Sequence, residues 1–184
     1  MEVVAIYGSP RRGGNSEVMM DTFLQEVNPS DRVNRIVASQ LHLGFCRGCR
    51  SCENTGHCVQ KDDMSQVVEF LLLADRVVVS SPVFFYAFPS SLKVLIDRIQ
   101  VLWSRKYLLK EEMKPKKGFL LAVGATKGKK LFDGIILTTR FFFDGFGCKY
   151  SGECVFRGYD KKGEIADCRE CREEIRQAAC SFLG

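Results

Sequence analysis

The sequence has no long hydrophobic run. Nowhere do about 18 consecutive apolar residues occur, so no membrane-spanning helix is predicted and no membrane partner is expected. The N-terminal segment MEVVAIYGSPRR also lacks the basic region, apolar region and cleavage site of a secretory signal peptide. Internal repeats, low-complexity tracts and long linkers are absent, and 184 residues suit one domain with a sizeable core. We therefore expect a single cytoplasmic domain over residues 1–184.

Histidine is scarce, and His42 and His57 are the only two in the chain. No constellation of a nucleophile with a general base is visible, so we do not expect catalysis by side-chain acids and bases. The net charge of +5 is modest, and the basic stretches at 104–118 and 127–130 lack the interleaved aromatics of a nucleic-acid site. These stretches favour a solvated surface, with a basic rim for an acidic electron carrier or an anionic cofactor as the alternative.

Cysteine, by contrast, is abundant, with nine in the chain. An odd number in a reducing compartment argues against a disulfide framework and favours buried thiols, metal ligation or redox chemistry. Four of them form the spacing C-x2-C-x2-C-x5-C. Three thiolates with two residues between each can wrap one face of a cubane cluster. Zinc also accepts four thiolates, with His57 able to replace one, although structural zinc sites more often use two separate C-x2-C pairs. The candidate ligands, for an iron–sulfur cluster or alternatively for zinc, are Cys46, Cys49, Cys52 and Cys58.

The other five cysteines have simpler interpretations. The C-x-x-C pair Cys168 and Cys171 falls inside a predicted closing helix, on the face that carries Ile175 and Ala179, so we expect buried small side chains. A second metal site built from this pair and the two cysteines near the fifth strand is a less favoured alternative. Cys148 and Cys154 are expected to be packing residues in the region of the fifth strand, and the position of Cys180 indicates no role.

Apolar periodicity alternates between strand-like and helix-like segments along the chain, which is typical of a parallel sheet with helical crossovers. Asp62 and Asp63 are candidate N-caps of the second helix. The order predicts a doubly wound α/β domain of five strands interleaved with five helices. The strands are expected at 3–7, 33–38, 76–81, 118–124 and within 148–156, and the helices over 18–27, 64–72, 92–103, 131–143 and 165–183.

In such folds, ligands bind beyond the carboxyl ends of the strands. The loop GSPRRGGNS (8–16) is rich in glycine, hydroxyl and amide groups and leads straight into a helix, which predicts an anion site. It lacks the Lys-Ser/Thr of a nucleotide-hydrolysing P-loop and the G-x-G-x-x-G of a dinucleotide site. The terminal phosphate of a mononucleotide fits this loop better.

The loop after the third strand, SSPVFFYAFPSS (80–91), carries three successive aromatic residues between a strand end and a helix start. Core packing is the usual fate of aromatic side chains, but loops at this position are normally polar. A flat aromatic ligand is therefore the sharper interpretation. GATKGKK (124–130) supplies a third, less specific loop, and we expect the cysteine-rich loop at 45–60 to lie at the same edge of the sheet.

Together, the two loops GSPRRGGNS and SPVFFYAFPSS resemble those of the NADPH-dependent FMN reductase family, whose flavodoxin-like fold implies the sheet order 2-1-3-4-5. The first aromatic after SPV is often tyrosine in that family and is Phe84 here, so a hydroxyl contact is not expected at that point. By this resemblance the FMN phosphate would be held by Ser9, Arg11, Asn15 and Ser16. The ribityl chain and isoalloxazine would be bordered by Pro82, Val83, Phe84, Phe85 and Tyr86, with Gly124, Ala125 and Thr126 on the other side.

The cysteine spacing resembles that of the iron–sulfur flavoproteins within this family, which implies FMN together with a 4Fe-4S cluster. The resemblance implies a redox enzyme that takes electrons from NAD(P)H or a reduced carrier such as ferredoxin, with the cluster as a one-electron relay. It also implies a homodimer or dimer of dimers, in which the arrangement is completed across a subunit interface. The alternatives are a cluster-free NAD(P)H-dependent flavin, quinone or nitro reductase, and a non-enzymatic flavodoxin-like carrier or redox sensor.

Overall fold

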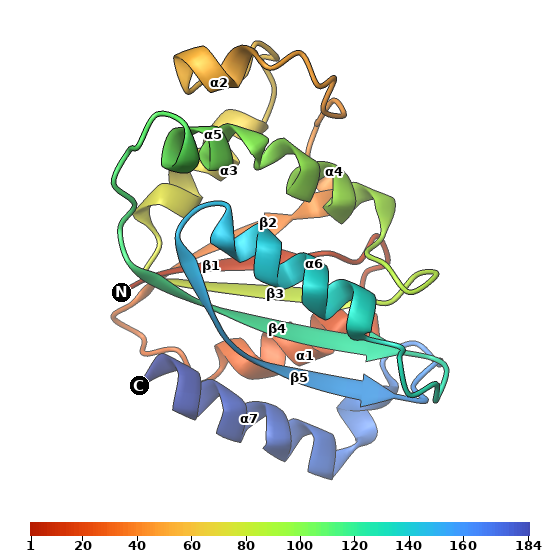
Figure 1. Cartoon of the computed structure of the whole chain (residues 1–184). Coiled ribbons are helices and arrows are strands. Elements are labelled where there is room, and N and C mark those ends of the chain that lie inside the picture. The colour runs from red at the N-terminus through yellow and green to blue at the C-terminus, as the bar shows by residue number, and fades with distance from the viewer.

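The computed structural model describes residues 1–184 and contains one parallel five-stranded sheet (Figure 1). The spatial order of the strands is β2-β1-β3-β4-β5, which confirms the predicted doubly wound, flavodoxin-like topology. The register is regular except at β4 and β5, where it shifts between Gly118 and Leu120. The strands are β1 (Glu2–Tyr7), β2 (Arg32–Val37), β3 (Arg76–Pro82), β4 (Lys116–Gly124) and β5 (Cys148–Arg157).

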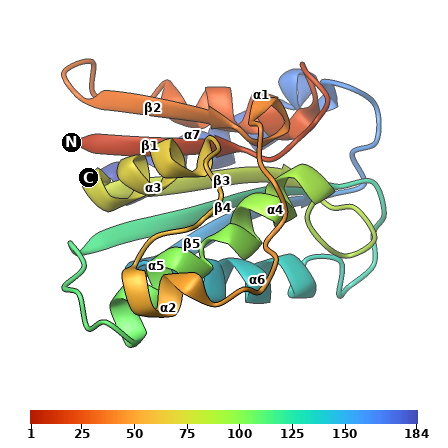
Figure 2. The same cartoon turned by 90° about the horizontal axis from the view of Figure 1, so that it is seen from above.

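Helices cover both faces of the sheet, as the crossovers of a parallel sheet require. One face carries α1 (Asn15–Leu24) and α7 (Arg169–Leu183), and the other carries α3 (Met64–Leu73), α4 (Ser90–Arg98), α5 (Gln100–Tyr107) and α6 (Asp133–Asp144) (Figures 1 and 2). A short helix, α2 (Ser51–Thr55), lies outside α5, and two 3₁₀ turns are found at Ala38–Gln40 and Glu164–Asp167. None of the helices is both long enough and apolar enough to cross a membrane.

Strand β1 shows how the sequence builds two cores. Its side chains alternate, so that Val4 and Ile6 enter the cluster beneath α3 to α6, whereas Ala5 and Tyr7 enter the cluster beneath α1 and α7. Because both faces are covered, the strand reads as a continuous apolar run. The two apolar layers hold the loops at the carboxyl edge of the sheet in fixed positions.

Three helices differ from their predicted extent, and the first of them, α1, spans Asn15–Leu24 in place of 18–27. The stripe over 92–103 is divided between α4 and α5 at Ile99, where the bonds Ile99 N–H to Ile96 O and Leu102 N–H to Ile99 O have the tighter i→i+3 spacing. The closing helix begins at Arg169, because Cys168 has extended backbone angles (φ −86°, ψ 102°) that interrupt the helical geometry. Apolar periodicity alone predicts neither the division at Ile99 nor the later start of the closing helix.

Candidate functional site

A cavity of about 240 Å³ opens at the carboxyl edge of the sheet, where the loops after β1, β3, β4 and β5 meet. Most of the residues predicted for flavin binding line it: Ser9, Arg11, Asn15, Ser16, Pro82, Val83, Phe84, Gly124 and Ala125. Phe85, Tyr86 and Thr126 are outside its wall. The structure thus brings the three predicted loops, 8–16, 80–91 and 124–130, together around one space, which we call the edge cavity.

The start of α1 supplies the polar end of the edge cavity. Its N-cap, Gly14, has extended backbone angles and makes no side-chain capping bond, so the N–H groups of the first turn keep no partner within the helix. The positive end of the helix dipole adds to these free donors, which suits a phosphate. Ser9 and Arg11 shape the loop before it, since Ser9 Oγ accepts from Arg11 N–H at 3.1 Å.

Asn15 has a structural task at this point. Its buried side chain donates to Lys161 O at 2.9 Å and accepts from Ile165 N–H at 3.1 Å. These bonds tie the start of α1 to the segment after β5. The amide of Asn15 is therefore occupied, and its backbone N–H is the group left to meet an anion.

The aromatic loop after β3 forms a tight two-residue turn. Phe84 and Ala87 exchange two backbone hydrogen bonds of 2.9 Å, and the residues between them, Phe85 and Tyr86, have φ values of 48° and 61°. Left-handed backbone is costly for bulky side chains, and such strain is concentrated at functional sites. Gly134 at the start of α6 is required here, because a Cβ atom would lie 2.5 Å from Tyr86 O. The turn projects Phe85 fully into solvent beside the edge cavity.

Sequence reasoning missed one wall of the edge cavity. Tyr159 and Asp160, which follow β5, line it, as do Gly14 and Val123. The available signal was position, because a loop that follows the fifth parallel strand opens at the same edge as the others. It was overlooked because FRGYD contains no recognisable motif.

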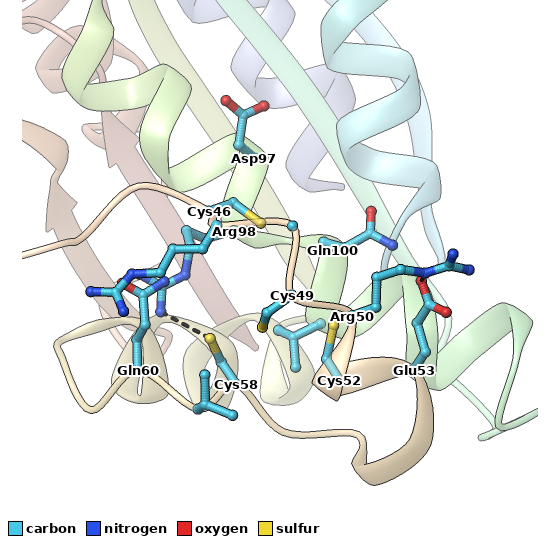
Figure 3. Close-up of a pocket in the computed structure, with 14 residues that line it drawn as sticks. Cys46, Cys49, Arg50, Cys52, Glu53, Cys58, Gln60, Asp97, Arg98 and Gln100 are labelled. Atoms are coloured by element: carbon cyan, nitrogen blue, oxygen red, sulfur yellow. Dashed lines mark hydrogen bonds and ion pairs between the residues drawn. The ribbon is translucent and has the colours of Figure 1, made fainter.

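The four predicted metal ligands line a second cavity of about 460 Å³, between the 45–60 loop and helices α4 and α5. In the view of Figure 3, Cys49, Cys52 and Cys58 surround one space, and Cys46 lies apart from them. All four are free thiols, a donor set that suits an iron–sulfur cluster or zinc. No three or more Cys, His, Asp or Glu side chains are arranged in the structure so that they could hold a metal ion.

Arg98 anchors the cysteine-rich loop from beneath. Its guanidinium is almost fully buried and donates to both carboxylate oxygens of Asp62, to Gly44 O at 2.6 Å and to Cys58 Sγ at 3.4 Å (Figure 3). Burial alone would raise the pKa of Asp62, but the hydrogen bonds from Arg98 and from two backbone N–H groups outweigh it and lower the pKa. Ser104 makes a second contact to sulfur, donating to Cys52 Sγ at 3.5 Å. Such donors stabilise thiolate ligands.

The cysteine-rich loop does not lie at the carboxyl edge of the sheet, contrary to expectation. It runs over the outer side of α4 and α5, where Arg105 Nε donates to Gly56 O at 2.7 Å (Figures 1 and 2). The two cavities share no lining residue. The bonds from Arg98 and Arg105 explain this path, because each holds a main-chain carbonyl of the loop against the helices.

The prediction for the C-x-x-C pair holds for Cys171, which is buried in the core with Ile175 and Ala179, but Cys168 is partly exposed and the bond between the two was not expected. Cys168 and Cys171 form a disulfide with their Cα atoms 5.3 Å apart, because the helix starts between them and not before them. Cys148 and Cys154 are buried as expected, and burial raises the pKa of each thiol to about 12. They belong to the cores on opposite faces of the sheet, so the four cysteines form no common site.

Comparison with known sequences places the chain among flavoproteins. Residues 1–131 match the NADPH-dependent FMN reductase family. An iron-sulfur flavoprotein of Archaeoglobus fulgidus is 36% identical over 100 residues, which cover 54% of this chain and 46% of that protein. One of Methanosarcina thermophila is 30% identical over 128 residues, covering 69% and 65%. The chain therefore spans about half to two thirds of the length of these relatives.

Solved structures confirm the fold. The NAD(P)H:quinone oxidoreductase from Methanothermobacter marburgensis superposes with a TM-score of 0.76 at 16% identity, covering 100% of this chain and 98% of that one. An FMN-dependent NADH-azoreductase from Bacillus anthracis, in complex with FMN, gives 0.69 at 13% identity with 99% of both chains covered. The residues that match the family include the edge-cavity loops after β1, β3 and β4 and the cysteine-rich loop, but not the loop after β5. The chain belongs to the NADPH-dependent FMN reductase family, and iron-sulfur flavoproteins are among its relatives.

Proposed function

We propose that the protein is an FMN-dependent oxidoreductase that passes electrons from NAD(P)H, or from a reduced carrier such as ferredoxin, to an acceptor. We propose further that a 4Fe-4S cluster on Cys46, Cys49, Cys52 and Cys58 serves as a one-electron relay. One observation carries the flavin part: an uncapped helix start and the aromatic ring of Phe84 line the same cavity. The first suits a phosphate and the second a flat ring system, and FMN contains both.

The residues around the edge cavity have distinct tasks in this proposal. The first-turn N–H groups of α1 and the Arg11 guanidinium bind the phosphate, and Phe84 with Gly124 and Ala125 borders the ring. When bound, FMN supplies the chemistry, because it exchanges electrons in pairs with nicotinamides and singly with other centres. The protein therefore binds and orients the cofactor and needs no acid–base pair. This agrees with the absence of histidine from the edge cavity.

The contacts beneath the cysteine-rich loop support a cluster. Four free thiols line one cavity, and two of their sulfur atoms already accept from Arg98 and Ser104. Arg47 also lines this cavity and has no ion-pair partner in the structure, whereas Arg50 and Arg98 are paired with Glu53 and Asp62, so Arg47 is the cation left to offset thiolate charge. Zinc on the same cysteines is the alternative, and the protein would then be a cluster-free flavin, quinone or nitro reductase.

We further propose a homodimer in which the cluster of one subunit faces the flavin of the next. Within one chain, the two cavities share no lining residue: one lies at the carboxyl edge of the sheet, and the other lies between the cysteine-rich loop and residues 97–101 of α4 and α5. Around the cysteine-rich loop and α6, several large apolar side chains are exposed, and such a patch is typical of a subunit interface. They are Phe45, Trp103, Leu137 and Phe141. Sedimentation of the wild type and of a Phe141→Glu variant would test this, because a monomeric wild type would contradict the proposal.

The cofactor and metal content of the purified protein, together with its activity, tests the proposed function. The full chain is prepared without oxygen and analysed for FMN, iron, acid-labile sulfide and zinc, and NADH or NADPH oxidation is followed with an artificial acceptor. We expect bound FMN, iron and sulfide in equal amounts, and turnover. Zinc without iron or sulfide would contradict the cluster, and failure to bind added FMN would contradict the flavin. A flavin-loaded protein that turns over neither nicotinamide nor reduced ferredoxin would instead be a carrier.

A Cys49→Ala variant separates the two sites. It is expected to lose the broad cluster absorbance and to keep the flavin bands, because the cavities share no lining residue. Cys180→Ala is the matched control, since Cys180 is an exposed free thiol far from both cavities along α7. Loss of both absorbances in the first variant would show that the sites are not independent.

A further inference from the structure

The start of α7 places a disulfide beside a tyrosine of the edge cavity. Cys168 is the N-cap of this helix, and its sulfur accepts from Cys171 N–H at 3.2 Å. The hydroxyl of Tyr159 lies 2.9 Å from Cys171 Sγ and 3.4 Å from Cys168 Sγ. Tyr159 also lines the edge cavity. A C-x-x-C disulfide at a helix N-terminus, with one sulfur buried, is a known arrangement for thiol–disulfide chemistry.

We propose that Cys168 and Cys171 form a dithiol–disulfide exchange centre, in which Cys168 is the sulfur that reacts with an external dithiol. This centre shares no residue with the four cysteines of the 45–60 loop, and Tyr159 is its one link to the edge cavity. Its partner is identified only by chemistry, as a dithiol, which a small molecule or a protein could supply.

Exposure distinguishes the two sulfur atoms. Cys171 is only 4% exposed and packs in the core beneath α7, whereas Cys168 is partly exposed. An incoming thiolate therefore reaches Cys168 Sγ first. The Cys171 N–H bond to Cys168 Sγ and the α7 dipole would stabilise a thiolate there, and the Glu170 carboxylate, 3.9 Å away, would oppose it.

A purely structural role explains the bond poorly. A disulfide stabilises a fold mainly by closing a loop in the unfolded chain, and this one joins residues only three apart. Helix α7 is already held by apolar side chains in the core, among them Ile175, Ala179 and Phe182. The bond thus adds little that packing does not provide.

The exchange proceeds in two balanced steps. A thiolate of the external dithiol attacks Cys168 Sγ, the bond between the two cysteines breaks, and Cys171 leaves as a thiolate that takes up a proton. The Tyr159 hydroxyl is placed to donate to that leaving sulfur. The second thiol of the reductant then attacks its own mixed disulfide, releasing Cys168. Two electrons and two protons pass to the pair, and the dithiol becomes a disulfide.

The first test uses the full wild-type chain. The folded protein is equilibrated in mixtures of reduced and oxidised dithiothreitol, quenched with acid, alkylated, and mapped by peptide mass spectrometry so that every cysteine is read separately. We expect the Cys168–Cys171 bond to open and re-form reversibly as a single two-electron step. A bond that stays closed in excess dithiothreitol in the folded protein, or a pair that stays reduced at every ratio, would overturn the proposal.

The second test assigns the reacting sulfur. In Cys171→Ser, Cys168 is expected to form a mixed disulfide with glutathione disulfide about tenfold faster than Cys180, the exposed thiol on the same helix. In Cys168→Ser, the buried Cys171 is expected to react more slowly than Cys180. Circular dichroism confirms that each variant is folded. Equal rates at Cys168 and Cys180 would overturn the assignment.

Discussion

The buried guanidinium of Arg98 donates to both oxygens of the Asp62 carboxylate, at 2.7 Å (Nη1 to Oδ2) and 3.0 Å (Nη2 to Oδ1). This bidentate pair joins the end of α4 to Asp62, two residues before the start of α3, and the same guanidinium donates to Gly44 O just before the cysteine-rich loop. Asp62 Oδ1 also accepts from the N–H of Met64, the first residue of α3, at 3.2 Å. Of the two predicted N-caps, Asp63 occupies the N-cap position, but its side chain makes no capping hydrogen bond, and Asp62 reaches the helix start from one residue earlier.

Asp62→Asn should destabilise the protein strongly, because it leaves the buried Arg98 charge without its partner. Breaking a buried ion pair in this way typically costs about 3–5 kcal/mol. The control is Asp97→Asn, which breaks the exposed pair Lys93–Asp97 one residue before Arg98 and should cost at most about 1 kcal/mol. Urea denaturation followed by circular dichroism measures both, and equal losses would contradict the role given to Arg98.

The same pair predicts a pH dependence. The pKa of Asp62 is lowered in the folded protein, so its contribution to the free energy of unfolding is complete above the unfolded-state pKa of about 3.9. It is lost as the pH falls through the lower, folded-state pKa. The stability difference between wild type and Asp62→Asn should therefore shrink below about pH 4. Denaturation curves at several pH values between neutrality and pH 3 measure it, and a constant difference would be inconsistent with the pair.

Arg11→Ala should weaken FMN binding by about tenfold to a hundredfold, the range expected for one hydrogen bond to a charged group. Riboflavin, which has no phosphate, should bind equally well before and after the change. Arg12→Ala is the matched control, because Arg12 lines a neighbouring cavity and not the edge cavity. Quenching of flavin fluorescence measures all affinities. An equal loss of riboflavin affinity would place Arg11 elsewhere than at the phosphate.

Replacing Phe85 and Tyr86 by Asn and Gly should raise stability by about 1–2 kcal/mol, because these residues accept left-handed backbone in a two-residue turn. A similarly exposed ring in helical backbone serves as the control, and Phe141→Asn should bring no gain. Thermal unfolding measures both variants. A destabilised turn variant would show that the aromatic side chains contribute more than their backbone strain costs.

Tyr159→Phe should shift the equilibrium of the Cys168–Cys171 pair toward the disulfide. The hydroxyl lies 2.9 Å from Cys171 Sγ, and a thiol or thiolate accepts its proton better than a disulfide sulfur does. The ratio of reduced to oxidised dithiothreitol at half-reduction should rise several-fold. An unchanged ratio would mean that the hydroxyl does not stabilise the reduced form of Cys171.

Much of the fold could be predicted because each strand and helix of a parallel sheet has a recognisable pattern in its own short stretch of sequence. The β-branched run RVVVSS marks β3 as a strand covered on both faces, and the alternation with helical stripes fixes the class of fold. Most residues assigned to flavin binding also line one cavity, since carboxyl ends of parallel strands share an edge. These predictions depend only on where a residue lies along its strand or helix, and apolar periodicity indicates that position well.

The predictions that failed concern features whose position depends on one or two individual contacts. The path of the cysteine-rich loop depends on the hydrogen bonds from Arg98 to Gly44 O and from Arg105 to Gly56 O. No pattern in the sequence predicts these two contacts. The disulfide depends on the residue at which α7 begins, and helix ends are poorly defined by periodicity. Tyr159 reaches the edge cavity through a loop without regular structure.

The sheet stands as a partition between the two groups of reactive sulfur. The cysteine-rich loop lies over the α3–α6 face, and the Cys168–Cys171 pair lies beside α7 on the opposite face (Figure 1). No thiol of one group can reach the other without unfolding the strands between them. A disulfide between the two groups within one chain would therefore require unfolding, so a peptide that links Cys171 to the loop, found in a chain of monomer mass, would identify a molecule that has unfolded.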